Sequence, residues 1–169
     1  MLPQADILQT IAEIAIAIAG FAALAGAFGT ARSEAQNSTA AFHSLRLVVT
    51  SGLFVLISAL IPLVIFDFGL AASTTWRLSS GLVLANNLIG LVRTLVKDEG
   101  ALAQTNEWNL RHIMWAIEVV CLAALVANVF AVFKEFASAL YLTFLVAQVA
   151  RVAMMFLRFF EIAFTREST

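Results

Sequence analysis

Charge, cysteine, proline and histidine are all scarce in this sequence. Only 12% of its 169 residues are charged, whereas about 25% are charged in a typical soluble domain. Cys121 is the single cysteine, so no disulfide can form within the chain. His43 and His112 are the only histidines and have no second ligand at metal spacing, which argues against a metal site.

Two large classes of function also lack their usual signals. The net charge is −1, and no stripe of Lys and Arg offers the surface that a nucleic acid backbone requires. We find no Ser–His–Asp or Cys–His constellation and no glycine-rich phosphate loop. The sequence therefore predicts neither a nucleic-acid-binding protein nor an enzyme, and it implies no cofactor.

Apolar residues, by contrast, are abundant. They make up 62% of the chain, and the mean hydropathy is +0.94. A soluble chain of this length keeps much of its area in water and cannot hide so many apolar side chains. Lipid must therefore form part of the solvent, and we expect an integral membrane protein whose first partner is the bilayer.

Five stretches have the length of about 20 mostly apolar residues that crosses a bilayer. They are residues 7–28, 47–67, 76–96, 113–133 and 139–160. The third is the least apolar, and the linkers are too short for a soluble domain. No basic residue precedes Arg32, so the first stretch is interpreted as a retained span and not as a signal peptide. We expect an all-α transmembrane bundle forming one membrane domain over residues 1–169.

The distribution of basic residues predicts the orientation of this bundle. Loops after the first, third and fifth stretches hold most of them, namely Arg32, Arg46, Arg93, Lys97, Arg111, Arg158 and Arg166. The opposite side holds only Arg77 and Lys134. Because cytoplasmic loops are enriched in Lys and Arg, we expect the amino terminus outside and the carboxyl terminus in the cytoplasm. Such a multi-pass protein fits a bacterial inner membrane.

Two backbone features stand out in the apolar stretches. Small residues recur every three to four positions in the first stretch, at Ala12, Ala15, Ala19 and Gly26. Such a face lets two helix backbones approach closely in lipid. In the second stretch Pro62 removes a hydrogen bond to the carbonyl of Ser58, which predicts a kink there.

Polar residues inside the stretches are the candidate functional groups. A rise of about 1.5 Å per residue places them in three layers. We expect Glu13 and Asn128 in the outer layer, Glu118 and Arg151 in the inner layer, and Ser58, Asn86, Asn87 and Gln148 in the middle. Because a lone arginine in lipid is costly, we expect Arg151 to pair with Glu118.

The third stretch is polar over a wide arc. Arg77, Ser80, Leu84, Asn87, Leu91 and Thr94 share one stripe along it. Such a helix lies deep in the bundle or borders water, and it cannot face lipid broadly.

Two functions fit these polar groups. In the first, they line the path of an ion, proton or small solute through a homo-oligomeric channel or transporter. In the second, they form structural hydrogen bonds in a non-conducting scaffold, sensor or accessory subunit.

Overall fold

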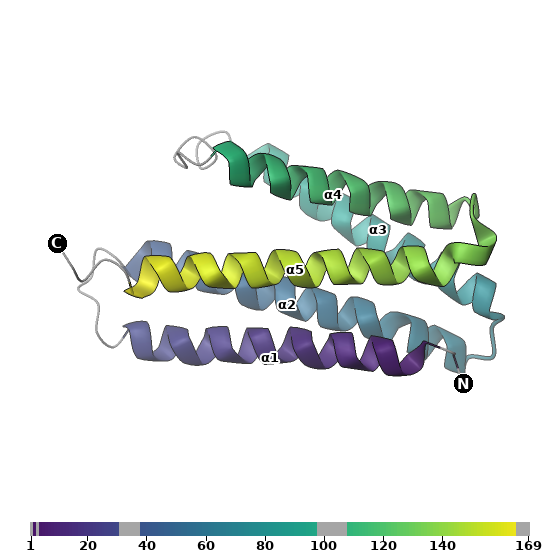
Figure 1. The fold of residues 1–169 in the computed structure, drawn as a ribbon, viewed down its shortest axis with the longest axis horizontal. Helices are drawn as coiled ribbons and strands as arrows, with labels where there is room; N and C mark the ends of the chain where they lie inside the picture. Colours follow the sequence, from purple (N-terminus) through teal and green to yellow (C-terminus); the bar gives the residue numbers. More distant parts are fainter. Residues whose placement is uncertain (1, 3, 31–37, 98–107, 165–169) are drawn as a thin grey trace. The chain divides into compact units, whose positions relative to one another are not determined.

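The computed structural model describes residues 2, 4–30, 38–97 and 108–164, and in this part the chain is helical apart from short turns (Figure 1). The all-α prediction is confirmed. The elements are α1 (Ala5–Thr30), α2 (Ser38–Asp67), α3 (Ala72–Lys97), α4 (Trp108–Val129), the 3-10 turn η2 (Lys134–Phe136) and α5 (Ala137–Phe164).

Three of these helices are long and apolar enough to cross a membrane. The segments are Ala5–Ala27 in α1, Leu45–Asp67 in α2 and Lys134–Phe160, which covers η2 and most of α5. They indicate an association with the membrane. Among the residues whose side chains the structure describes, α4 holds a shorter apolar segment, Trp115–Val129. The five-span count and the orientation of the termini remain predictions.

The carboxyl end of α4 differs from the predicted span 113–133. The helix ends at Val129 because Ala131 adopts a left-handed conformation with φ of 53°. The amide of Val132 then bonds the carbonyl of Ala127 at 3.0 Å, and the amide of Ala131 bonds that of Asn128 at 3.1 Å. This pair of bonds is the Schellman motif, which closes a helix.

The chain divides into two compact units. The first unit comprises Pro3–Leu60 and Leu145–Thr169, and the second comprises Ile61–Phe144. The helices α2 and α5 therefore each contribute residues to both units. The division in α2 falls between Leu60 and Ile61, close to the buried Pro62, and α2 continues as one helix through this proline.

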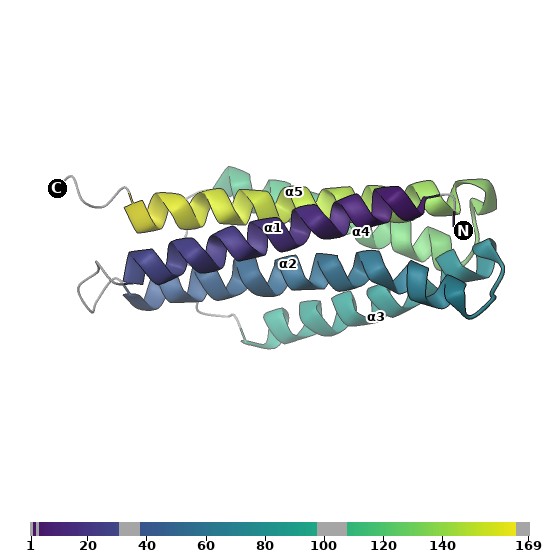
Figure 2. The same ribbon diagram turned by 90° about the horizontal axis from the view of Figure 1, so that it is seen from below.

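In the first unit α1 packs against α2 through small residues. The side of α1 that carries Ala12, Ala15, Ala19 and Gly26 is buried. A methyl group built on Gly52 of α2 would lie 3.0 Å from Cβ of Ala19 and 3.2 Å from the carbonyl oxygen of Ala15. The two backbones thus come as close as small residues permit, and Figure 2 shows the helices side by side.

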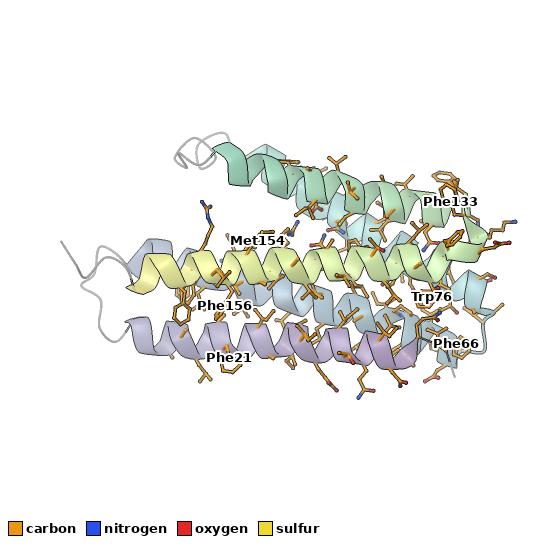
Figure 3. The ribbon with its side chains drawn as sticks, in the orientation of Figure 1. Phe21, Phe66, Trp76, Phe133, Met154 and Phe156 are labelled. Atoms are coloured by element: carbon orange, nitrogen blue, oxygen red, sulfur yellow. The ribbon has the colours of Figure 1, made fainter. Side chains whose placement is uncertain are left out.

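The second half of α5 completes the first unit. The hydroxyl of Ser51 in α2 lies 4.0 Å from the sulfur of Met155 in α5. The buried stripe of α5 in this unit comprises Leu145, Gln148, Val152 and Phe159. On the outer surface of α1, Phe21 projects away from α5 and is 65% exposed (Figure 3).

The second unit is built on α3 and α4, which run antiparallel (Figure 1). A methyl group on Gly81 of α3 would meet Val129 of α4 at 3.9 Å. The ring of Trp76 in α3 packs on Tyr141 of α5, with centroids 5.6 Å apart, and Tyr141 packs on Phe144. Trp76 and Tyr141 are buried, so aromatic side chains hold the start of α5 in this unit.

Candidate functional site: the polar seam between α3 and α4

One buried amide connects three helices of the second unit. The Asn128 side chain of α4 is 1% exposed. Its Nδ2 donates to Ser80 Oγ of α3 at 2.8 Å and to the carbonyl oxygen of Ala137, the first residue of α5, at 2.9 Å. Because the Ala137 carbonyl can only accept, the orientation of the amide is fixed, with Oδ1 on the other side.

An arginine lies at the same end of this helix pair. Arg77 Nε donates to the carbonyl oxygen of Val129 at 3.2 Å. Val129 is the last residue of α4, and its carbonyl has no partner within the helix. A guanidinium at a helix carboxyl terminus also interacts favourably with the helix dipole. Arg77 thus links the start of α3 to the end of α4 through this hydrogen bond.

The contact between Ser80 and Asn128 fixes the register of the two helices. In an antiparallel pair, equal steps in opposite directions reach the same level. Steps of three, four and three residues, taken forwards along α3 from Ser80 and backwards along α4 from Asn128, stay on the face of each helix that carries this contact. From this one contact we infer that Val83 is level with Leu125, Asn87 with Cys121, and Gly90 with Glu118. We call these six residues, together with Ser80 and Asn128, the polar seam.

Burial changes along the seam. Ser80, Asn128, Val83 and Leu125 are all at most 1% exposed. Asn87 and Glu118 are half-buried, and Gly90 is exposed with nothing within 4 Å of the position its Cβ would take. The seam is therefore closed at the Asn128 end and open towards Glu118, with one apolar layer between the amides.

Three buried polar atoms near the seam have no hydrogen-bond partner among the described residues. They are Oδ1 of Asn128, Nδ2 of Asn87 and Oγ of Ser79. Ser79 is adjacent to Ser80 on α3 and is fully buried. Buried polar atoms normally have partners, so such a group is a candidate for contact with water or a polar solute.

Polar groups of the first unit form a separate layer. Ser58 in α2 and Gln148 in α5 are each 1% exposed. Each lies seven residues, or about two turns, from the contact between Ser51 and Met155. Because the two helices are antiparallel, Ser58 and Gln148 are at one level. Arg151, one turn further along α5, is half-buried.

The remaining predicted residues have varied positions. Glu118 belongs to the second unit and Arg151 to the first, and their pairing stays a prediction. Asn86 is exposed, although its neighbour Asn87 is on the seam. Glu13 is also exposed, and Gln9 Nε2 donates to its Oε1 at 3.3 Å.

The predicted site residues do not include Ser79 or Ser80. The contact of Arg77 with α4 was not predicted either. The recurrence of polar residues along residues 76–96 was their only signal in the sequence. Among the described residues, no group of three or more His, Cys, Asp or Glu side chains could hold a metal ion.

Comparison of the chain with protein-family models, curated proteins and solved structures finds no match.

Proposed function

We propose that this chain is a multi-pass membrane protein in which the polar seam is the path of a proton, an ion or a small polar solute. All five long helices cross the bilayer, with the amino terminus outside and the carboxyl terminus in the cytoplasm. The protein works as a homo-oligomer, and a bacterial inner membrane is its proposed location. The role is transport and not catalysis.

The observation that carries this proposal is the chemistry of the seam. Two amides and a carboxyl group occupy one face of the pair α3–α4, within a protein that is otherwise strongly apolar. Polar and ionisable groups inside membrane segments usually face the bundle interior or a water-filled cavity, where they mark the paths of ions and protons. The polar character of α3 supports the same role, since this helix needs water or protein around it.

The apolar layer of Val83 and Leu125 gives this path a closed state. It separates the amide of Asn128 from that of Asn87, and both of its side chains are fully buried. Hydrophobic constrictions block conduction by excluding water. Conduction therefore requires α3 and α4 to separate at this layer.

A non-conducting scaffold or accessory subunit is the alternative. It is favoured by the two hydrogen bonds of Asn128 to Ser80 and Ala137, because these bonds fix three helices in place. Hydrogen bonds between membrane helices contribute about 0.6 kcal/mol each on average, which suits a structural role.

Flux measurements separate the two functions. Purified protein is reconstituted in liposomes, and ion and proton flux is recorded at both signs of potential and at two pH values. Flux above that of empty vesicles, reduced in Glu118→Gln but unchanged in Glu135→Gln, is the expected result. Glu135 is a matched control because it is exposed in η2, outside the seam. Folded protein without flux under any condition would favour the scaffold.

The topology has its own test. Reporter fusions at residue 104 are expected to report a cytoplasmic position, and fusions at residue 71 an external one. The reverse pattern would reject the orientation. Two external positions would show that α3 and α4 do not both cross, and the proposed path would then lose its transmembrane route.

A further inference from the structure

The helix α1 has three stripes of different chemistry, and within each stripe successive members are three, four or seven residues apart. The buried stripe consists of Leu8, Ala12, Ala15, Ala19, Ala22 and Gly26. A second stripe is exposed and apolar, with large side chains at Ile7, Ile14, Phe21 and Leu24. The third stripe is also exposed and consists of Gln9, Glu13, Ile16, Gly20, Ala23 and Ala27. We call it the α1 polar stripe.

The two exposed stripes suit different surroundings. Large apolar side chains are well placed against lipid tails. The α1 polar stripe instead holds a carboxyl and an amide, although both lie within the apolar segment Ala5–Ala27. Glu13 is eight residues past Ala5, or about 12 Å along the helix. An ionisable group at such depth is costly against lipid and normally faces protein or water.

The geometry points to a second copy of this chain as the partner that covers the α1 polar stripe. Two copies inserted in the same membrane have the same orientation, so their α1 helices are parallel and their Glu13 residues lie at the same depth. Across the two-fold axis, Gln9 of each copy can donate to Glu13 of the other. Glutamine has two N–H donors, and the bond to Glu13 of its own helix at 3.3 Å uses one of them.

The rest of the stripe fits this pairing. Positions 9, 13, 16, 20, 23 and 27 alternate steps of four and three, which is the a/d spacing of a parallel coiled coil. Gly20 has nothing within 4 Å of the position its Cβ would take, so its surface is open to a neighbour. Small residues at 20, 23 and 27 allow two backbones to approach closely in lipid. A symmetric pair satisfies the polar groups of both copies with one contact.

This inference rests on the insertion of α1 in the membrane and not on conduction through the polar seam. Its test is disulfide cross-linking of the full chain in vesicles, in a background in which Cys121→Ala removes the natural thiol. Gly20→Cys and Ile16→Cys each place a thiol on the α1 polar stripe. Ala17→Cys and Ile14→Cys place one on the neighbouring apolar stripe and are matched controls, since all four positions are exposed. Oxidation is expected to link the first two variants into dimers and to leave the controls monomeric.

A second measurement separates specific pairing from random collision. Gln9→Leu is expected to raise the dissociation constant of the dimer roughly fivefold to tenfold, because two symmetric hydrogen bonds are lost. Glu13→Gln keeps hydrogen bonding at the same depth, so its dimer should form as well as that of the parent chain. Gly20→Ile should prevent close approach, whereas Ala17→Ile should not. Equal cross-linking on both stripes, or none on either, would overturn the inference, even if flux is observed.

Discussion

Asn128 donates a hydrogen bond of 2.8 Å to Ser80, and this contact fixes the register of α3 against α4. The same Nδ2 bonds the carbonyl oxygen of Ala137 at 2.9 Å, so α5 begins where the other two helices meet. Asn128 and Ser80 are both fully buried. A buried hydrogen bond between two helices restricts which residues can face each other, because a shift of either helix would leave its polar atoms without these partners.

Substitutions at this contact should differ in a fixed order. Asn128→Ala removes both hydrogen bonds and leaves the Ala137 carbonyl without this donor, so the free energy of unfolding should fall by about 1–3 kcal/mol. Asn128→Asp should be at least as harmful, because a carboxylate accepts and cannot donate. Ser80→Ala removes one bond and should cost only about 0.6 kcal/mol. Thermal unfolding in detergent measures the order, and equal loss in Ser80→Ala and Asn128→Ala would contradict it.

Gly52→Ala should loosen the contact between α1 and α2. The new methyl would lie 3.0 Å from Cβ of Ala19 and 3.2 Å from the Ala15 carbonyl oxygen, and a backbone atom cannot easily give way. We expect a loss of about 1–3 kcal/mol, as for other overpacked sites. Gly20→Ala is the matched control, because nothing lies within 4 Å of its Cβ position.

The Gly20→Ala variant should gain up to about 1 kcal/mol from helix propensity. Both variants are compared by thermal unfolding at a dilution that keeps the chain monomeric. If Gly52→Ala proved as stable as Gly20→Ala, α1 and α2 would not be packed as closely as described.

Ala131→Gly should stabilise the protein. Ala131 has a φ of 53°, a conformation that costs alanine about 1–2 kcal/mol and glycine very little. We expect most of this energy to be recovered as a higher unfolding temperature. Ala127→Gly, four residues earlier and inside α4, is the matched control and should destabilise by about 1 kcal/mol. Destabilisation by both substitutions would indicate that α4 does not end in the left-handed turn.

Hydrophobic periodicity predicted the all-helical fold. Apolar stretches predicted helices close to those observed, and in α1 the recurrence of Ala12, Ala15, Ala19 and Gly26 marks the side that is now seen to be buried. The end of α4 could not be predicted in the same way. Its left-handed residue is Ala131, where glycine would have been the usual signal.

The sequence by itself determined the composition of each helix face, because side chains three and four residues apart share a face whatever surrounds them. The tertiary structure decided which faces meet. Asn86 and Asn87 are chemically identical neighbours, yet Asn86 is exposed and Asn87 lies on the polar seam. Asn87 is seven residues, or about two turns, from Ser80 and shares the face of α3 that meets Asn128, whereas Asn86 does not. Such a contact between residues 48 positions apart has no local signature in the sequence.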